Sequence, residues 1–240
     1  MDLYLQGQSV AVIGAGNGIG RAIAMGFVAE GCQVYGFDRD VKAATVPGMK
    51  ALVTGDVSKL DEVRAFADQM GEADHVIFCV GIGSGKFGFP FWNLDPADWI
   101  RVLEINLVGA VNVAHAFAPK LITRNKGSML FLVSVAGQIG SQTDPPYSAS
   151  KAGVIALTKS LAKEVATKGV LVNAVAPAAA KTAMFATMAQ THIDYMLSKI
   201  PMGRFVEVDE IAAMVSWLSS EDCSFTTGSV FDITGGRSTY

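Results

Sequence analysis

Tyr147 and Lys151 are the residues whose types and spacing could move a proton. They lie four positions apart in the segment "PPYSASK" (145–151), and a helix would place them on one face with their Cβ atoms about 5–6 Å apart. A tyrosine alone is a poor acid or base at neutral pH, because its pKa is ~10. An ammonium group beside it favours the phenolate and lowers that pKa. A bare Tyr–Lys pair is nevertheless more typical of a solvated helix face.

Two further polar residues could complete a catalytic site. Ser134 ends a predicted strand, 13 residues before Tyr147, and its hydroxyl could hold a substrate oxygen. This placement favours chemistry over the surface pair. Asn106 falls in "LEINLVGA" (103–110), which we expect to be helical. Its ordinary interpretation is a buried amide that bonds to the backbone.

The segment "VIGAGNGIG" (12–20) is typical of a turn that approaches a pyrophosphate. Gly14, Gly18 and Gly20 follow an apolar strand and open a helix near the N-terminus. Glycine permits the tight turn, and the free N–H groups of a helix N-terminus stabilise an anion. A glycine-rich turn alone could equally be a plain tight turn, but this context favours a dinucleotide site.

The residues beyond the glycine turn indicate which dinucleotide would bind. Asp38 ends the second predicted strand, where a carboxylate can accept bonds from the adenosine ribose hydroxyls and repel a 2′-phosphate. Its ordinary interpretation is a turn aspartate. Arg39 could meet a phosphate, but Asn17 occupies the turn where a basic residue would favour NADP. Asp56 and Val57 fit an adenine contact or an ordinary turn before a helix. NAD is therefore the expected cofactor.

Seven apolar segments predict the strands that carry these residues, and they alternate with helical patterns. The predicted strands cover 9–14, 32–38, 50–55, 75–81, 128–134, 170–176 and 229–234. The predicted helices begin near residues 20, 59, 97, 147 and 208, with Ser58 expected to open the second and Asp95 and Pro96 the third. This alternation predicts an α/β fold, a doubly wound seven-stranded parallel sheet with helices on both faces.

Composition and charge exclude several classes of function. The chain has 240 residues, 17% of them charged, and a net charge of −3 without a basic run, so nucleic acid and anionic membranes are unfavoured partners. The stretch 105–119 is too short and polar to span a bilayer. The three separated cysteines indicate a cytoplasmic, reduced protein. No secretory signal is expected, and the three histidines show no metal-ligand spacing.

At this point the sequence resembles the short-chain dehydrogenase/reductase family over nearly the whole chain. "GAGNGIG" (14–20) is similar to its cofactor loop, and Ser134 with "YSASK" (147–151) to its catalytic set. The segments 170–177 and 201–236 resemble its sixth strand and C-terminal part. The resemblance implies a single Rossmann-fold domain over 1–240. Related enoyl reductases have a longer gap between the tyrosine and the lysine, so the spacing favours alcohol–ketone exchange.

The resemblance also implies a role for each site residue. Tyr147 would be the general acid/base, and Ser134 would hold the same substrate oxygen. Lys151 would lower the pKa of Tyr147 and bind the nicotinamide ribose, while Asn106 would keep a water in a proton relay to Lys151. The expected cofactor contacts are Gly14, Asn17, Gly18, Ile19, Gly20, Asp38, Asp56, Val57, Gly81, Tyr147, Lys151, Pro177 and Thr182.

Five positions depart from the family pattern. Ile13 stands where threonine is usual, "FCVG" (78–81) replaces Asn-Asn-Ala-Gly and keeps only Gly81, and Ala178 replaces a glycine. None of these positions carries a proton or a hydride. We therefore expect altered bracing of the cofactor loops and weaker cofactor binding, but no loss of chemistry.

Two segments that break the alternation are expected to frame the substrate: the loop 82–92 and the lid segment 178–204. The aromatic residues of the loop could bind an apolar substrate or pack at an edge of the core; they are Phe87, Phe89, Phe91 and Trp92. Met184, Phe185 and Met188 are expected on the inner face of a lid helix. The polar residues 138 and 141–143 favour a small polyol, sugar or sugar acid.

The leading hypothesis is an NAD(H)-dependent oxidoreductase that interconverts a secondary alcohol and a ketone. An NADPH-dependent 3-oxoacyl thioester reductase is the alternative enzyme, which Asp38 disfavours and Arg39 leaves open. A non-catalytic nicotinamide-binding sensor or scaffold is the alternative of a different class. The resemblance further implies a homotetramer, with the helices at 97–120 and 147–168 at an interface.

Overall fold

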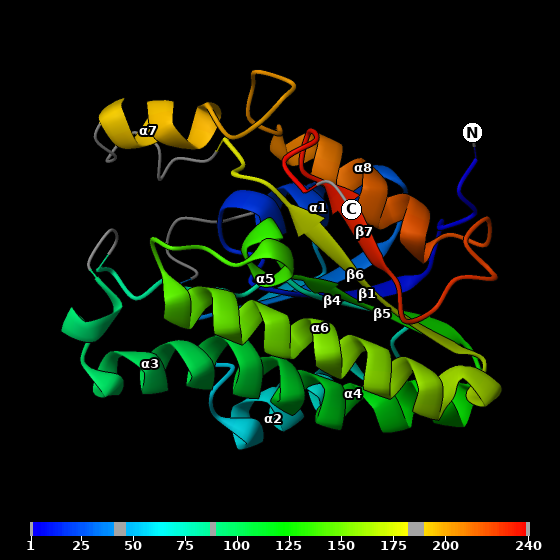
Figure 1. Ribbon diagram of the computed structural model, residues 1–240. Helices are drawn as coiled ribbons and strands as arrows, with labels where there is room; N and C mark the ends of the chain where they lie inside the picture. The colour runs from blue at the N-terminus through cyan, green and yellow to red at the C-terminus, as the bar shows by residue number, and fades with distance from the viewer. Residues whose placement is uncertain (1, 41–46, 87–89, 182–189, 239–240) are drawn as a thin grey trace.

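The central feature of the computed structural model is a seven-stranded parallel sheet in the order β3-β2-β1-β4-β5-β6-β7 (Figure 1). The structure describes residues 2–40, 47–86, 90–181 and 190–238. The strands are β1 (Ser9–Ile13), β2 (Gln33–Asp38), β3 (Ala51–Thr54), β4 (His75–Phe78), β5 (Gly127–Leu132), β6 (Val170–Pro177) and β7 (Val230–Ile233). The predicted fold class is confirmed, and each predicted strand overlaps an observed one.

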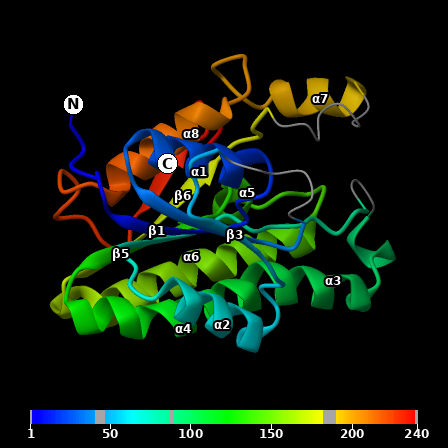
Figure 2. The ribbon, with the colours of Figure 1, turned by 180° about the vertical axis from the view of Figure 1, so that it is seen from behind.

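Helices cover both faces of the sheet, and each face buries its own apolar core. On one face lie α2 (Leu60–Met70), α3 (Pro96–Leu103), α4 (Gly109–Arg124) and α6 (Pro145–Val165). On the other lie α1 (Gly18–Ala29) and α8 (Val208–Ser219), as Figure 2 shows from behind. The short α5 (Val135–Ile139) follows β5 and packs against α6. The strands between these layers are nearly continuously apolar because both of their faces are covered.

The order of the strands places a ligand site at one edge of the sheet. Strand β1 lies between β2 and β4, so the chain crosses to opposite faces on its two sides. The loops after β1 and β4 therefore diverge at the carboxyl ends of these strands. In doubly wound sheets, ligands bind in the crevice that this divergence opens.

A long helical stretch, Pro96–Arg124, changes its winding in the middle. Asp95 caps its start by accepting a bond from the Ala97 N–H (2.9 Å), as predicted. Residues Glu104–Val108 form a π-helical turn between α3 and α4, which the sequence did not reveal. By length and composition this stretch could cross a membrane, but half of its apolar window is buried within the molecule, as in a core helix.

Two predicted helix starts were wrong. Ser58 does not cap α2, because Lys59 occupies the cap position and the Asp56 carboxylate instead accepts a bond from the Ser58 N–H (2.8 Å). Helix α6 begins at Pro145 rather than at Tyr147, because proline fits the first turn of a helix, where no N–H is needed.

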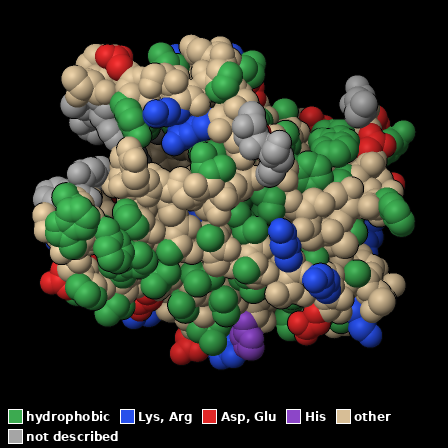
Figure 3. All heavy atoms as spheres, viewed as in Figure 1, with side chains coloured by type: hydrophobic (Ala, Val, Ile, Leu, Met, Phe, Trp, Pro, Cys, Tyr) green, Lys and Arg blue, Asp and Glu red, His purple; other side chains and the backbone are tan. Residues whose placement is uncertain are grey.

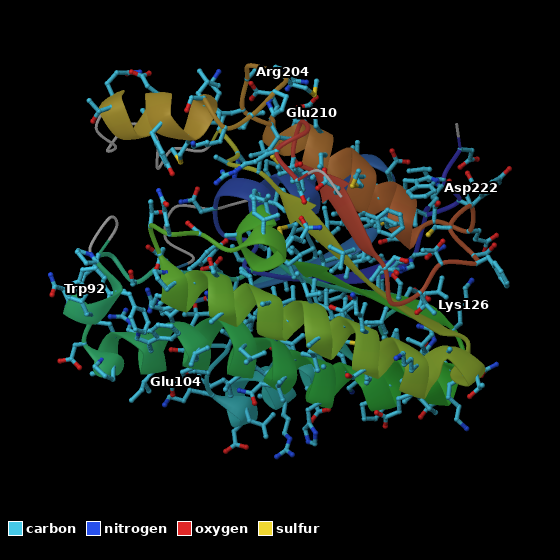
Figure 4. The ribbon with its side chains drawn as sticks, viewed as in Figure 1. Trp92, Glu104, Lys126, Arg204, Glu210 and Asp222 are labelled. Carbon is cyan, nitrogen blue, oxygen red and sulfur yellow. The ribbon has the colours of Figure 1, made fainter. Side chains whose placement is uncertain are left out.

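The segment 178–204 rejoins the body of the molecule beside α8. It contains α7 (Gln190–Leu197), and its Ala180 forms a parallel bridge with Val206, which follows the segment. Its end is fixed by Arg204, whose guanidinium donates two bonds, of 2.7 and 2.8 Å, to the Glu210 carboxylate (Figure 4). This pair holds the pKa of Glu210 down to about 2. The predicted lid residues Met184, Phe185 and Met188 lie outside the described residues.

Candidate active site

The first turns of α6 bring Tyr147 and Lys151 to the carboxyl edge of the sheet. Both line a cavity of about 970 Å³ that Ser134 also lines. Lys151 is 2% exposed, and its Nζ lies 5.8 Å from the centre of the Tyr147 ring. The pair therefore does not lie on a solvated helix face, and the structure brings together the three residues expected to perform the chemistry.

The backbone of two neighbouring strands holds the Lys151 ammonium. Its Nζ donates to the carbonyl oxygens of Leu132 (2.8 Å) and Val80 (3.2 Å). Gly81 allows this approach, since a Cβ at residue 81 would lie 2.9 Å from Nζ. Gly81, the one residue of "FCVG" that matches the family pattern, thus shapes the site through the side chain it lacks.

Ser134 is positioned by the short helix α5, for which it is the N-cap. Its Oγ accepts a bond from the Ala136 N–H (3.1 Å), and its side chain also hydrogen-bonds Tyr147. An N-cap serine has a fixed side-chain direction because its hydroxyl is tied to the first helical turn. The sequence placed Ser134 at the end of a strand, but it gave no sign of the helix that orients the hydroxyl.

Burial dominates the titration of the Tyr–Lys pair. Desolvation raises the pKa of Tyr147, the bond with Ser134 opposes this effect, and the nearby charge of Asp144 adds to it. Desolvation also lowers the pKa of Lys151 to about 8. In the protein without cofactor, burial thus disfavours the charged form of both groups. That Lys151 lowers the pKa of Tyr147 stays a prediction.

Asn106 is fully buried in the π-helical turn, and protein groups satisfy its amide. Its Oδ1 accepts from the Ile82 N–H (2.8 Å), and its Nδ2 donates to the Ile82 carbonyl and to Ser150 Oγ (2.9 Å each). Ser150 Oγ in turn donates to the Tyr147 carbonyl (2.7 Å). Asn106 therefore ties the loop after β4 to the first turn of α6, and its part in a water relay stays a prediction. A π-turn is a common feature of functional sites.

Backbone atoms of the glycine turn lie too close to one another and to Asp38 to leave room for larger side chains. Gly14 has φ +92°, and a Cβ on Gly20 would collide with the Gly14 carbonyl. The Gly16 N–H donates to Asp38 Oδ2 (2.8 Å), and a Cβ on Gly16 would lie 2.8 Å from Asp38 Cγ. Sequence reasoning missed Gly16. Its signal was a further glycine in the turn after β1, next to the acidic end of the neighbouring strand β2.

Asp38 opens into a second cavity, of about 240 Å³, at the ends of β2 and β3. Asp56 and Val57 also line it, together with Arg39. Bonding from Ser58 lowers the pKa of Asp56. The expected adenosine contacts therefore surround one cavity, and the structure keeps Arg39 beside it.

The two cavities meet at Cys79 and Gly81, which line both. Burial raises the pKa of the Cys79 thiol to about 12, so this residue of "FCVG" is a neutral wall. Ile19 and Pro177 line the larger cavity, and Asn17 caps α1 by accepting from the Gly18 N–H (2.7 Å). Thr182 lies outside the described residues. Two adjoining cavities, with a carboxylate in the smaller one and a crowded glycine turn beside it, are what an extended dinucleotide requires.

The larger cavity has further walls in the expected segment 178–204, and one, Arg237, that the sequence did not indicate. It is closed on the α7 side by Tyr195, Met196 and Lys199, with Arg237 following β7. Figure 3 shows this hollow beneath α7, with Lys and Arg side chains at its rim. Asp144 lines it beside Tyr147. Polar residues 141–143 line it as expected, because the chain from α5 to α6 runs along its edge.

The aromatic residues of the loop 82–92 do not form the substrate wall where they are described. Trp92 is 81% exposed at the outer end of the molecule (Figure 4), and Phe91 is 61% exposed, with its ring edge against Trp99. Neither lines the cavity. Phe87 and Phe89 lie outside the described residues. Phe91 and Trp92 therefore neither line the cavity nor pack into the core.

Comparisons with known proteins agree with this geometry. The family model described as enoyl-(acyl carrier protein) reductase matches residues 14–238. The 2-dehydro-3-deoxy-L-rhamnonate dehydrogenase (NAD(+)) of Sphingomonas sp. (strain SKA58) is 40% identical, over 98% of this chain and 96% of its own. The 3-oxoacyl-[acyl-carrier-protein] reductase FabG of Staphylococcus epidermidis (strain ATCC 35984) is 33% identical, over 95% and 98%.

A solved structure is similar along nearly its whole length. The 3-oxoacyl-[acyl-carrier protein] reductase of Brucella melitensis superimposes with a TM-score of 0.91 at 31% identity, covering 98% of this chain and 92% of its own. Sequence, fold and site therefore agree: the chain belongs to the short-chain dehydrogenase/reductase family and is an oxidoreductase.

Proposed function

We propose that the protein is an NAD⁺-dependent dehydrogenase that oxidises a secondary hydroxyl of a sugar acid. The observation that carries this proposal is the convergence of Ser134, Tyr147 and Lys151 in a cavity that shares the wall residues Cys79 and Gly81 with the one that Asp38 lines. A substrate in the larger cavity lies beside the acid/base pair, and a dinucleotide can extend from there to Asp38.

Each residue has a role that its contacts support. Ser134 and Tyr147 hold the substrate oxygen, and Tyr147 accepts its proton as the phenolate, after its own proton has passed to solvent. Lys151, held by two carbonyls, places a positive charge near the phenol. NAD⁺ supplies hydride acceptance when bound. The Tyr147 proton is the one that burial makes hard to remove, so a cation placed beside the phenol lowers the barrier to proton transfer.

The substrate class follows from the charges in the cavity and from a relative. Lys199 and Arg237 line the cavity, and neither makes an ion pair within the described ranges. Two cations without carboxylate partners favour an anionic substrate. The relative at 40% identity is named for a sugar acid and for NAD(+). A small hydroxylated acid therefore fits the site best.

The alternative is an NADPH-dependent 3-oxoacyl thioester reductase, as the relatives at 31–33% identity are named for 3-oxoacyl reduction. Arg39 beside the smaller cavity favours it. Asp38 opposes it, because a carboxylate there repels a 2′-phosphate. Three residues between Tyr147 and Lys151 also favour alcohol–ketone exchange over the enoyl reduction that the family model's description names.

The test is oxidation of 2-dehydro-3-deoxy-L-rhamnonate and of a panel of sugar acids and polyols, followed as nicotinamide absorbance with NAD⁺ and with NADP⁺. We expect turnover with NAD⁺ and a kcat/KM at least tenfold lower with NADP⁺. Asp38→Ala should reduce the difference in kcat/KM between NAD⁺ and NADP⁺, because the repulsion of the 2′-phosphate is lost. A clear preference for NADP⁺ in the unmodified protein would contradict the cofactor assignment.

Tyr147→Phe separates an enzyme from a nicotinamide-binding sensor or scaffold. The phenylalanine keeps the ring and removes the proton-transfer group, and acid/base groups contribute about 10²–10⁴-fold. We expect kcat to fall by that factor or more, while the dissociation constant for NADH changes less than threefold. Turnover that survived this change would assign the acid/base role to another residue.

Assembly and location complete the proposal. We infer a homotetramer in the cytoplasm, with α4 and α6 at a subunit interface, because the resemblance to the family implies this assembly. The three cysteines are free thiols, as a reducing compartment requires. Sedimentation velocity should give a species of about four chain masses, and a monomer would contradict the assembly.

A further inference from the structure

The larger cavity carries positive charge, although the chain as a whole has a net charge of −3. Its charged lining residues, within the described part of the chain, are Lys151, Lys199, Arg237 and one acidic residue, Asp144. Lys151 is 2% exposed and already bonds to two backbone carbonyls. Lys199 and Arg237 are thus the cations that remain for a ligand. A hollow lined by charges of one sign concentrates ligands of the opposite sign.

Lys199 and Arg237 come from separate elements that meet at this cavity. Lys199 follows α7, and Arg237 follows β7. Figures 1 and 2 both show α7 at the carboxyl edge of the sheet, on the side away from α6. Tyr147 belongs to α6, so the two cations and the acid/base come from different walls. A ligand that contacts all three must carry an anionic group in addition to the oxygen that reacts.

Lys199 is positioned by Tyr195, four residues before it. Its Nζ lies 5.1 Å from the centre of the Tyr195 ring, and the ring face attracts an ammonium group at such a distance. The Tyr195 hydroxyl accepts a hydrogen bond from Gln142 Nε2 (3.2 Å), on the chain between α5 and α6. Tyr195 and Gln142 also line the cavity. This bond therefore joins the α7 wall to the wall that precedes Tyr147 and keeps the ring that holds Lys199 at the cavity.

Arg237 suits the same anion because of its shape and its place. Its side chain is half-buried and makes no ion pair with any residue in the described ranges. A guanidinium presents parallel N–H groups that match the two oxygens of a carboxylate. The Arg237 N–H donates to the Thr234 carbonyl (3.3 Å), which ties the residue to the turn after β7. One cation is thus anchored to the sheet, and the other is supplied by α7.

We propose that Lys199 and Arg237 form a subsite for the substrate carboxylate, and that Tyr195 is the positioning residue of Lys199. This inference rests on the proposed function and assigns the residues that select an acid over a neutral alcohol or a thioester. The carboxylate bridges α7 and the segment after β7, while the hydroxyl reaches Ser134 and Tyr147. Because the carboxylate does not react, its bonds are equal in the ground state and the transition state, and they set KM rather than kcat.

The test compares an acid with its neutral methyl ester. The probes are 3-hydroxybutanoate and methyl 3-hydroxybutanoate, which carry the same secondary hydroxyl, each oxidised with NAD⁺ at pH 7. In the unmodified protein we expect kcat/KM to be at least tenfold higher for the acid. Raising the salt concentration from about 20 mM to about 500 mM should reduce that preference at least threefold, because salt screens exposed charges.

Lys199→Gln and Arg237→Gln should each raise KM for the acid at least fivefold, with kcat within twofold and both constants for the ester unchanged. The matched control is Lys181→Gln, which removes a charge from the same segment at a residue that pairs with Glu207 and lies outside the cavity wall. It should change no value. Tyr195→Leu should raise KM for the acid in the unmodified protein but not in Lys199→Gln, because a positioning residue acts through the side chain that it positions.

The outcomes that would overturn the inference differ from those that would refute the function. Equal kcat/KM for acid and ester, or a higher value for the ester, would show that no carboxylate subsite exists. A fall in kcat for both probes would make the substituted residue structural, and a KM effect in only one variant would refute the paired site. If neither probe is oxidised, the same KM criterion applies to 2-dehydro-3-deoxy-L-rhamnonate or another sugar acid that is. Failure of every sugar acid would instead refute the proposed function, and the inference with it.

Discussion

The Lys151 side chain combines a positive charge with almost complete burial, and this combination lowers the free energy of unfolding. Its ammonium bonds only to two backbone carbonyls, those of Leu132 and Val80, among the residues described. No carboxylate compensates for the lost hydration, and burial lowers the pKa of Lys151 from 10.5 to about 8. The charge that the proposed mechanism uses is thus held at the expense of stability.

We expect Lys151→Met to change how stability depends on pH. Between pH 8 and 10.5, the unfolded chain keeps the Lys151 proton and the native protein releases it. The unmodified protein therefore gains stability relative to the variant as pH rises through this window, by up to about 3 kcal/mol. Below pH 8 both states are protonated, and the difference is constant.

Urea unfolding of both proteins at pH 7, 8, 9 and 10 measures this effect. The matched control is Lys163→Met, on an exposed part of the same helix, whose difference from the unmodified protein should not vary in this way. A Lys151→Met curve parallel to that of the unmodified protein would show that the lysine is hydrated in the native state.

Residue types and spacing predicted Ser134, Tyr147 and Lys151, because their geometry depends on two short-range facts: the end of a strand and one helical turn. They did not predict the raised pKa of Tyr147, because desolvation depends on what the fold places around the ring.

At the scale of elements, α1 contains two glycines with opposite structural roles. Gly20 lies at its start, where a Cβ would collide with the Gly14 carbonyl. Gly26 lies in its interior, where a Cβ would make an ordinary contact of 3.5 Å with Ala212. The same substitution at the two positions therefore separates cofactor-turn geometry from helix propensity.

We expect Gly20→Ala to weaken NADH binding at least tenfold and to lower the melting temperature, because the turn must open to admit the methyl group. Gly26→Ala should keep NADH affinity within twofold and raise stability by up to about 1 kcal/mol, the helix propensity gain of alanine. NADH fluorescence titration and thermal unfolding measure both. Equal NADH affinities in the two variants would show that the turn accommodates a methyl group at residue 20 without disturbing the cofactor site.

Periodicity predicted the strands well because a strand buried on both faces is a continuous apolar run. It failed at element boundaries and at irregular turns. The π-turn around Asn106 depends on tertiary bonds to Ile82 and Ser150, and an apolar helical pattern does not encode them. Helix α5 is likewise too short for a periodic signal.

At the scale of the whole molecule, the candidate site and a buried histidine that affects stability lie at opposite edges of the sheet. The candidate site lies at the carboxyl ends of the strands, whereas His75 begins β4 at the opposite edge. His75 is 4% exposed, and its Nδ1 lies 2.8 Å from Ser128 Oγ. Its Nε2 bonds to Gln8 Oε1, and because that oxygen can only accept, Nε2 carries a proton. Burial lowers the pKa of His75 to about 4.

This buried ring should make the protein acid-sensitive without affecting the chemistry. Between pH 6.5 and about 4, His75 binds a proton in the unfolded chain but not in the native protein. The free energy of unfolding therefore falls as pH falls, by up to about 1.4 kcal/mol per pH unit. His75→Gln, which can keep both bonds without titrating, should flatten this slope in urea unfolding at pH 4.5–7. His115→Gln, at an exposed histidine, should leave it unchanged. Because His75 lies at the other edge of the sheet, kcat at pH 7 should be the same in all three proteins; a loss of kcat in His75→Gln would show that the two edges are coupled.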